Sequence, residues 1–523
     1  MPRATGATSA NTSSAIRDKR TTWLVVVGLF AAVIALHLWS LTRTPAVFVD
    51  EGNYASEAWG LVQTGWAFGP VQSGVLNHFP GYWTYFPWLG TFFQSLGIRA
   101  LGLSLFSLRL VSLVFGLLLL VAIFVIAERL RGVRTACFAV ALVALSSSFF
   151  ESAHLARQDI FVAAFGYGSV ALYLVDRDSR FSVRAVLSGL AIGLAFEIHP
   201  NATIYGPALV AFYLVDHGWA TFRLKRFWGF VAGGLAGGCF WAAMHLLPYP
   251  QTFIAITRLQ FGVSKAPPAL VLDPGIWLRS LDDTIWVIVS AGDYVAAVVV
   301  AVAIVILARR GSPADRRLVL LFAVLALGFL TLVSYKPVYY NILLSPAEDL
   351  VVAAFLGRLL ELPTAAFRRV MLPLTVVLLA GSAAFNVSAA RDNALADYQQ
   401  TIRQIRPVLP AGSVVMGDQT FWIGLHDYKF YTWQELTTYQ RYTGDTSLAD
   451  GFRAYHPDFF IVDGYVRFHI SDDRGKYEPW AQLLNLPKTD LETFLTRRAR
   501  VVKQVDDPQL GPVVVYKLDW SSR

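Results

Sequence analysis

Charged residues and cysteines are both scarce in this chain, and each scarcity narrows the class of protein that it can be. Only 15% of the 523 residues are charged, whereas 55% are hydrophobic. These fractions of charged and hydrophobic residues are unusual for water-soluble chains of this length and typical of integral membrane proteins. The net charge of +8 indicates no nucleic-acid partner, because the basic residues are placed as a membrane topology requires.

The chain has only two cysteines, Cys137 and Cys239. Both fall inside apolar runs, where a thiol usually packs as a small hydrophobic side chain. The sequence therefore predicts neither a disulfide framework nor a thiolate metal site.

Long apolar runs are abundant, and they predict about eleven spanning helices of roughly 20 residues each. The runs cover residues 23–41, 106–127, 134–150, 159–175, 185–215, 228–247, 284–308, 316–334, 338–360 and 369–388. The run 185–215 is too long for one crossing. We expect it to break into two helices near His199 and Pro200, because proline disfavours helix at the preceding residue.

Basic residues gather in every second loop, which predicts that these loops are cytoplasmic. They are Arg129, Arg131 and Arg134; Arg177, Arg180 and Arg184; Arg223, Lys225 and Arg226; Arg309, Arg310, Arg316 and Arg317; and Arg368 and Arg369. Residues 1–20 are expected to be a disordered cytoplasmic N-terminus that is not a cleaved signal peptide. A multi-pass plasma-membrane domain over residues 21–388 would then place everything after it outside the cytoplasm.

Residues 389–523 regain charged and turn residues and contain short β-rich runs at 413–416, 459–462 and 513–516. This pattern predicts a soluble extracytoplasmic α/β domain. Several of its side chains are of metal-ligating type, but ordinary surface or capping roles are the favoured interpretation. They are Asp418, His426, Asp427, His456, Asp458 and Asp463.

The first external loop, residues 43–105, is long and dense in aromatic residues. It predicts one or two amphipathic helices on the outer leaflet, with a simple aromatic belt as the alternative. Asp50 and Glu51 lie at its start, just outside the first apolar run. Adjacent carboxylates beside aromatic residues suggest chemistry, and a merely solvated pair is the alternative.

Two further external segments carry charges. The loop 151–158 brings Arg157 and Asp159 to the mouth of a span, and Lys336 follows a later span. Arg157 and Asp159 form either a functional pair or a structural ion pair, and Lys336 either binds a ligand or snorkels to the interface. Because nucleotide-activated sugars are made in the cytoplasm, a transferase at this face needs a donor within the membrane, such as a polyprenyl-phosphate sugar. Asp50 can deprotonate an attacking hydroxyl, while Arg157 and Lys336 can bind the departing phosphate.

Five short motifs occur in an order that resembles the C-type glycosyltransferase superfamily, in particular the protein O-mannosyltransferases and aminoarabinose transferases. The motifs are FVDEGNYA at 48–55, FPGYW at 79–83, SLRL at 107–110, HLARQD at 154–159, and SYK at 334–336 followed by Tyr340 and Pro346. Together they cover residues 20–390. The resemblance implies the polytopic helical fold of that superfamily and a glycosyl transfer with inversion.

The resemblance also implies roles for individual residues. Asp50 would be the general base, Glu51 would help to hold the acceptor, and Asp159 would shape the sugar site. The donor phosphate would contact Arg157 and Lys336, with Tyr340 in the same set.

One departure from the family pattern concerns metal binding. Where aminoarabinose transferases have Glu-Lys before paired prolines, this chain has Asn77 and His78. The missing Glu removes a metal ligand, and His78 would replace the lysine at the phosphate. No other spacing resembles a dedicated metal site, so the need for a divalent cation stays open.

The expected function is therefore transfer of a sugar from a polyprenyl-phosphate donor to an extracytoplasmic glycan, lipid or protein. A lipid or sugar transporter is the main alternative, and a non-catalytic assembly protein is the second. Transporters usually place their charges at the membrane midplane and often show repeated halves. Here the distinctive charges gather at one face.

Overall fold

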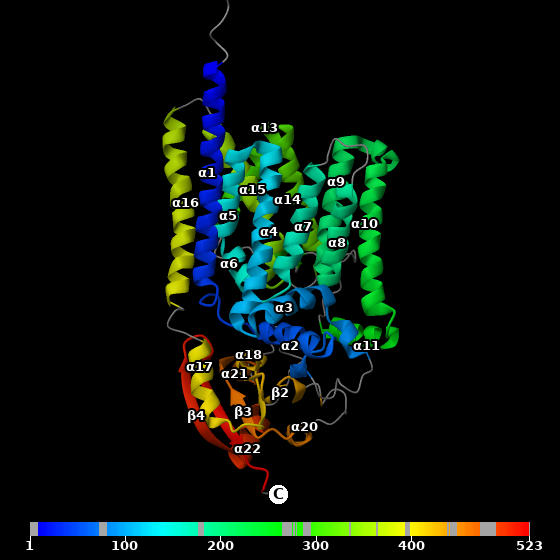
Figure 1. The fold of residues 1–523 in the computed structure, drawn as a ribbon, viewed down its shortest axis with the longest axis vertical. Helices are drawn as coiled ribbons and strands as arrows, with labels where there is room; N and C mark the ends of the chain where they lie inside the picture. The colour runs from blue at the N-terminus through cyan, green and yellow to red at the C-terminus, as the bar shows by residue number, and fades with distance from the viewer. Residues whose placement is uncertain are drawn as a thin grey trace, which may run out of the picture.

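A computed structural model describes most of the chain, including every predicted site residue except His78. The described residues are 9–72, 81–175, 183–263, 275, 278, 280–285, 294–333, 336–361, 365–392, 398–436, 439, 447–470 and 488–521. They form a bundle of long helices, a layer of short helices across one end of it, and an α/β domain beyond that layer (Figure 1).

The bundle consists of helices that correspond to the predicted apolar runs. They are α1 (Ser9–Ser40), α4 (Leu105–Arg131), α5 (Val133–Leu145), α6 (Ser147–His154), α7 (Asp159–Val175), α8 (Val183–Ile198), α9 (Tyr205–His217), α10 (Lys225–Trp241), α13 (Tyr294–Arg310), α14 (Pro313–Leu332), α15 (Ser345–Glu361) and α16 (Ala365–Asp392). Among the described residues, 3 helices are long and apolar enough to cross a membrane: Thr21–Ser40, Leu105–Arg131 and Lys225–Leu246. The predicted break after α8 is confirmed, because the 3-10 turn η4 (Pro200–Ile204) separates α8 from α9.

Three helix boundaries differ from the predicted ones. α1 begins at Ser9, so the segment expected to be disordered is helical from that residue, since extending an existing helix costs little. The run 134–150 is bent by 65° between α5 and α6, where Ser146 caps α6 by accepting a hydrogen bond from Phe149 N at 3.2 Å. The run 338–360 begins as the 3-10 turn η7 (Val338–Leu343), and Pro346 lies in the first turn of α15, a position that suits proline.

Helices α8 and α10 pack with their backbones in close contact. A Cβ atom built on Gly189 would lie 1.8 Å from Phe230 O, and one built on Gly237 would lie 2.5 Å from the Cα of Gly193. Small residues let membrane helices approach in this way. This contact fixes α8, whose C-terminal end carries Glu197.

The layer across the end of the bundle is built by residues of the predicted aromatic loop together with a later helix. Its elements are α2 (Val49–Thr64), η1 (Pro70–Gln72), η3 (Tyr82–Tyr85), α3 (Trp88–Leu101) and α11 (Pro250–Val263). Glu197 caps α3, because its carboxylate accepts hydrogen bonds from Trp88 N at 2.6 Å and Leu89 N at 3.1 Å. It also bonds to His245 Nε2 at 3.0 Å. The layer is thus tied to the bundle by a buried carboxylate at a helix N-terminus.

The C-terminal domain contains a sheet of five strands in the order β2-β1-β3-β5-β4. Its strands are β1 (Val414–Gly417), β2 (Lys429–Thr432), β3 (Phe459–Val462), β4 (Ala499–Asp507) and β5 (Gly511–Leu518). β1 is parallel to β2 and β3, whereas β5 is antiparallel to β3 and β4. The predicted strands β1, β3 and β5 are the apolar central ones, and the two missed strands are the more polar edges.

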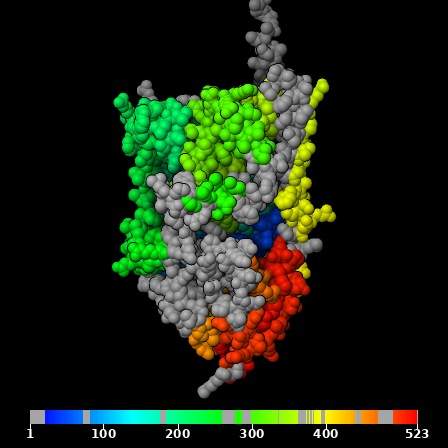
Figure 2. Space-filling view, turned by 180° about the vertical axis from the view of Figure 1, so that it is seen from behind, coloured from blue at the N-terminus to red at the C-terminus, as the bar shows by residue number. Residues whose placement is uncertain are grey.

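Short helices surround this sheet: α17 (Tyr398–Ile405), η9 (Arg406–Val408), η10 (Gln419–Phe421), α18 (Trp422–Leu425), α20 (Leu448–Tyr455), α21 (Gly464–Ile470) and α22 (Lys488–Arg498). From behind, the orange and red surface of the domain lies at the lower end of the molecule (Figure 2). A single apolar cluster joins α2 residues such as Ala55 to domain residues such as Phe421 and Trp422. The domain is therefore packed onto the helical layer.

Candidate active site

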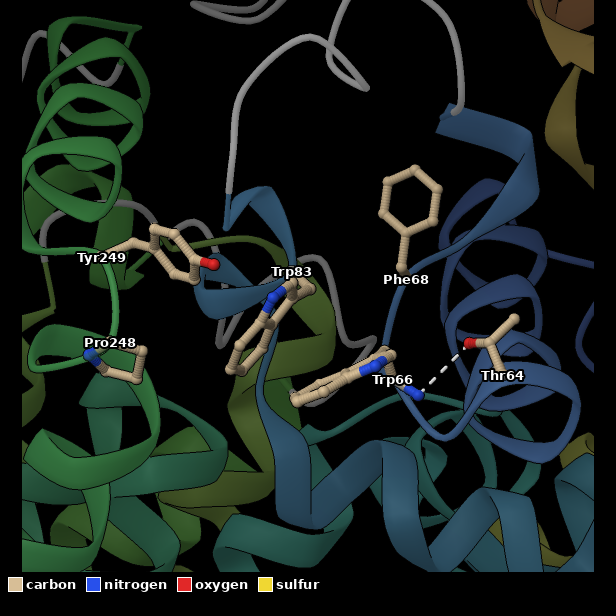
Figure 3. Close-up of a pocket in the computed structure, with 6 residues that line it drawn as sticks. All are labelled: Thr64, Trp66, Phe68, Trp83, Pro248 and Tyr249. Atoms are coloured by element: carbon tan, nitrogen blue, oxygen red, sulfur yellow. Dashed lines mark hydrogen bonds between the residues drawn. The ribbon is translucent and has the colours of Figure 1, made fainter.

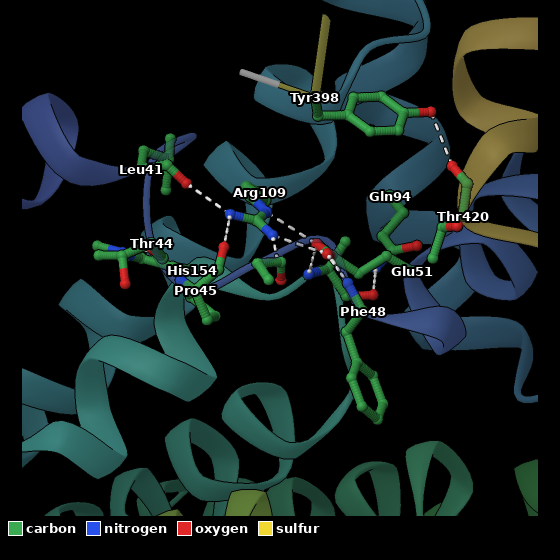
Figure 4. Close-up of polar contacts among 12 residues, drawn as sticks. Leu41, Thr44, Pro45, Phe48, Glu51, Gln94, Arg109, His154, Tyr398 and Thr420 are labelled. Atoms are coloured by element: carbon green, nitrogen blue, oxygen red, sulfur yellow. Dashed lines mark hydrogen bonds and ion pairs between the residues drawn. The ribbon is translucent and has the colours of Figure 1, made fainter. Parts of the chain in front are cut away.

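Glu51 lies in a buried ion pair with Arg109 at the start of α2 (Figure 4). Arg109 donates to Glu51 from Nη2 at 2.8 Å and from Nε at 2.9 Å. Both side chains are 0% exposed. Arg109 also donates to the carbonyl oxygens of Leu41, Pro45 and Ala46. Arg109 thus joins the start of α4 to the start of α2 and to the segment before it.

The remaining hydrogen bonds of Glu51 are also to the protein itself. Its carboxylate accepts from Phe48 N at 2.9 Å and from Ala156 N at 2.9 Å. Glu51 therefore joins the start of α2 to the segment before Arg157. The carboxylate of Glu51 is buried and bonded within the protein, and its expected acceptor-holding role stays a prediction.

Asp50 and Asp159 both contact Arg157. Arg157 Nη1 donates to Asp50 Oδ2, and Arg157 Nε donates to Asp159 Oδ2 at 2.9 Å. The side chain of Asp50 is 32% exposed, whereas those of Arg157 and Asp159 are each 4% exposed. The guanidinium lies 3.7 Å from the centroid of the Tyr339 ring. Asp50 is thus the accessible member of a buried acid–arginine–acid cluster.

Tyr54 and Tyr340 lie beside this cluster. Burial raises the pKa of Tyr54 well above its ordinary value, and the charge of Asp159 adds to the effect. Tyr340 Oη shares a hydrogen bond with His199 Nε2 at 3.0 Å, and His199 Nδ1 accepts from Asn201 N at 3.2 Å. His199 is therefore a satisfied structural histidine, which is the interpretation that the sequence favours.

Lys336 is buried between α14 and η7, apart from the cluster. Its ammonium donates to Ser280 Oγ at 2.7 Å and to Val333 O at 2.6 Å. Burial lowers the pKa of Lys336 to about 8, and the charge of Asp283 opposes that shift. Among the described residues, the structure shows no hydrogen bond between Lys336 and the Arg157 cluster. Lys336 does not snorkel outward, since its ammonium is held inside.

The described residues include no group of three or more His, Cys, Asp or Glu side chains that could hold a metal ion. The acids and histidines of the C-terminal domain named above are among these described residues. His78 and its neighbour Asn77 lie outside the described residues, so the expected phosphate contact of His78 stays a prediction.

Two buried polar side chains near the cluster, Glu57 and His154, could not be singled out from the sequence. Glu57 is buried on α2 within 3.4 Å of Thr91 Oγ1, and burial raises its pKa well above the ordinary value. His154 bonds to Thr44 O at 2.8 Å and to His37 Nδ1 at 2.9 Å. His154 lies inside the HLARQD motif, which is the only hint of its place near the site.

A separate aromatic cavity of about 760 Å³ lies at the other end of α2. Its lining residues are Thr64, Trp66, Phe68, Trp83, Pro248 and Tyr249, and Figure 3 shows the rings of Trp66 and Trp83 close together. Because α2 rises about 1.5 Å per residue over its 16 residues, this cavity is about 20 Å from Asp50. None of the predicted site residues that the structure describes lines it.

The fold of this chain resembles that of proteins of known structure. The chain is similar to ArnT from Cupriavidus metallidurans bound to undecaprenyl phosphate, with a TM-score of 0.63 and 16% identity over 95% of this chain and 98% of that one. The apo state of the same protein gives a TM-score of 0.59 over the same shares. The chain therefore has the C-type glycosyltransferase fold, and the resemblance predicted from its motifs is confirmed at that level.

Comparison of sequences names a more specific class of enzyme than comparison of folds, but the matches cover a smaller part of the chain. Residues 86–244 match the family described as dolichyl-phosphate-mannose-protein mannosyltransferase. Over 147 residues the chain is 30% identical to the polyprenol-phosphate-mannose–protein mannosyltransferase of Corynebacterium glutamicum. That match spans 28% of this chain and 28% of the relative.

Proposed function

We propose that this protein is a membrane glycosyltransferase that moves a sugar from a polyprenyl-phosphate donor to an acceptor outside the cytoplasm. The observation that carries the proposal is the cluster of Asp50, Arg157 and Asp159, in which an accessible carboxylate and a buried cation meet. The fold and the mannosyltransferase relatives support the same conclusion. Transporters usually place their charges near the membrane midplane, whereas these charges lie at one end of the bundle.

The proposed reaction is one displacement at the anomeric carbon. The acceptor oxygen forms a new bond to that carbon while the bond from the carbon to the phosphate oxygen breaks. The electron pair of the broken bond leaves on the phosphate, and Asp50 takes the proton of the acceptor hydroxyl. Attack opposite to the leaving phosphate inverts the configuration.

Arg157 supports this reaction by binding the phosphate. Its guanidinium donates hydrogen bonds to two carboxylates, those of Asp50 and Asp159. A dianionic phosphate entering beside Arg157 competes with Asp50 for the guanidinium, because arginine binds phosphate through the same planar donors. Binding of the donor would thereby free Asp50 to accept the proton, while buried Asp159 keeps Arg157 in place.

The other predicted site residues take supporting roles in the proposal. Glu51 positions Asp50 through Arg109, and Tyr340 helps to line the site beside Asp159. Lys336 supplies a second positive charge for the phosphate, provided that its ammonium turns from Ser280 to the ligand. His78, which lies between η1 and η3 in the sequence, would also contact the phosphate.

The proposed topology follows the charge distribution. The N-terminus lies in the cytoplasm, and the α/β domain over residues 389–523 lies outside it, after the transmembrane domain over residues 21–388. Donor, bilayer lipids and acceptor would then meet at the layer formed by α2 and α3. The acceptor is a glycan, a lipid or a protein.

The test is sugar release from radiolabelled polyprenyl-phosphate monosaccharides by the purified full-length protein in nanodiscs. A mannose donor with a protein acceptor is the first combination, because that is the pair named for the Corynebacterium glutamicum relative. Glycan and lipid acceptors, and parallel reactions with EDTA or added divalent cations, complete the set. Turnover of one donor supports the proposal, whereas no turnover of any donor across the panel contradicts it.

A further inference from the structure

Helix α2 lies between the bundle and the C-terminal domain, and its two faces have different partners. On one face, Asp50 binds Arg157, and Glu57 lies within 3.4 Å of Thr91 on the neighbouring helix α3. The opposite face carries Gly52, Ala55 and Trp59, spaced three and then four residues apart. Residues at such spacing share one face of an α-helix.

This second face packs on residues 418–425, which contain η10 and α18 and are called the docking segment here. Ala55 is fully buried in the apolar cluster that also contains Phe421 and Trp422. The ring of Trp59 lies 5.5 Å from that of His426, directly after the docking segment. The same apolar cluster therefore covers the back of the helix that presents Asp50.

Gly52 makes the closest approach in this contact. A Cβ atom built on Gly52 would lie 2.0 Å from the carbonyl oxygen of Gln419 and 2.5 Å from its carbonyl carbon. Non-bonded carbon atoms prefer a separation of about 3.5 Å or more, so any side chain at this position displaces α2 or the docking segment by more than about 1 Å. Only glycine permits the observed packing.

The docking segment is itself held by buried hydrogen bonds. Asp418 accepts from Thr420 N at 3.0 Å and from Trp433 Nε1 at 3.3 Å. Tyr398 Oη donates to Thr420 O at 2.7 Å and accepts from Gly424 N at 3.0 Å. The carbonyl of Gln419 is thus fixed from both sides and cannot easily yield to a larger residue at position 52.

The direction of the resulting displacement is set by helix geometry. Residues two apart in an α-helix point about 200° from one another, so Gly52 and Asp50 point to nearly opposite sides of α2. A push at Gly52 therefore drives Asp50 toward Arg157. Misplacement of a catalytic group by 1 Å lowers rates by about 100-fold.

We propose that the C-terminal domain is a positioning part of the active site, with Gly52 as the positioning residue that sets the distance between α2 and the docking segment. This inference rests on the proposed function, because it assigns the domain a role in holding Asp50 against Arg157. It gives the domain a specific task, because the domain supports the back of the helix that carries Asp50.

The test compares Gly52→Ala with Gly168→Ala in the full-length protein. Gly168 lies inside helix α7, and a Cβ atom built there meets nothing within 4 Å. We expect Gly52→Ala to lower kcat at least tenfold while KM for the donor stays near the wild-type value. Gly168→Ala should match wild type in both. Wild-type kcat in Gly52→Ala would overturn the inference, since a purely structural glycine predicts no selective effect on kcat.

A second readout is independent of activity. Amide hydrogen exchange should rise in α2 and in residues 418–425 of Gly52→Ala and stay unchanged elsewhere. If wild type turns over no donor, the proposed function fails, and unchanged exchange in α2 would overturn the positioning inference separately.

Tyr398→Phe covers the case in which Gly52→Ala does not fold. This variant removes one hydroxyl and loosens Thr420 and Gly424 without adding bulk. Its kcat should fall several-fold at unchanged donor KM, with faster exchange in residues 418–425. Wild-type kcat and exchange in a folded Tyr398→Phe would contradict the inference.

Discussion

Arg157 and Glu51 illustrate how the charged residues of this site differ in their contacts. Its guanidinium is buried, stacked on Tyr339 and bound to Asp50 and Asp159. Glu51, next to Asp50 in the chain, instead points into the protein and pairs with Arg109. Adjacent carboxylates thus have separate roles, because neighbouring residues of a helix face different sides.

Glu51→Gln tests the structural role of the buried pair. The change keeps the shape of the side chain but leaves the charge of Arg109 uncompensated in the interior. We expect a loss of about 3–5 kcal/mol in stability, as is usual when one partner of a buried pair is removed. The measurement is unfolding of the purified protein in detergent.

Asp427→Asn is the matched control, because Asp427 pairs with Arg406 at the surface and both side chains are about half exposed. Exposed pairs contribute below about 1 kcal/mol. Equal effects of Glu51→Gln and Asp427→Asn would contradict the structural role of Glu51.

Lys336 predicts a pH dependence of donor capture. Burial lowers its pKa to about 8, so the ammonium is present below pH 8 and is lost as the pH rises through that value. If Lys336 binds the donor phosphate, kcat/KM for the donor should fall above pH 8, since this ratio reports groups of the free enzyme. The measurement is kcat/KM between pH 6.5 and pH 9.5.

Lys336→Arg is the control, because arginine keeps its charge over this range. The decline above pH 8 should be absent in that variant. An identical decline in wild type and Lys336→Arg would assign it to another group and contradict the phosphate role of Lys336.

At the scale of elements, α8 and α10 depend on glycine at their crossing. Gly237→Ala places a methyl group 2.5 Å from Gly193 Cα. We expect destabilisation of about 1–3 kcal/mol, as overpacking commonly produces, visible as a lower Tm in detergent. Gly238→Ala is the matched control, because nothing lies within 4 Å of its Cβ position. A Tm of Gly237→Ala equal to that of Gly238→Ala would contradict the close contact.

Most elements of the bundle could be predicted from hydropathy, because each apolar run must form a helix to satisfy its backbone in lipid. The bend at Ser146 could not, since a single serine cap within an apolar run leaves hydropathy unchanged. The edge strands β2 and β4 were missed because their sequences, KFYT and ARVVKQVDD, mix apolar with charged and polar residues and form no apolar run.

The site was predictable in part. Asp50, Arg157 and Asp159 could be found because their motifs lie at ends of apolar runs, and the fold brings those ends together. The buried pairing of Glu51 and the close approach of Gly52 to Gln419 could not be predicted. Both depend on tertiary contacts between segments that are remote in sequence.

At the scale of the whole molecule, the α/β domain and the layer of α2 and α3 form one end of the protein (Figure 1). The charge distribution predicts that this end lies outside the cytoplasm. A C-terminal alkaline phosphatase fusion should therefore be active, and a green fluorescent protein fusion at the same position should be dark. Fluorescence of the latter fusion with an inactive phosphatase would contradict the topology.

The central claim is that Asp50 activates the acceptor hydroxyl. The most direct measurement is sugar transfer by Asp50→Asn from the donor that wild type uses, with Asp427→Asn as a surface control. Loss of a general base typically costs 100-fold to 10,000-fold in rate, so we expect Asp50→Asn to fold, to bind the donor lipid and to lose transfer by at least about 100-fold. A folded Asp50→Asn that transfers sugar at the wild-type rate would contradict the account.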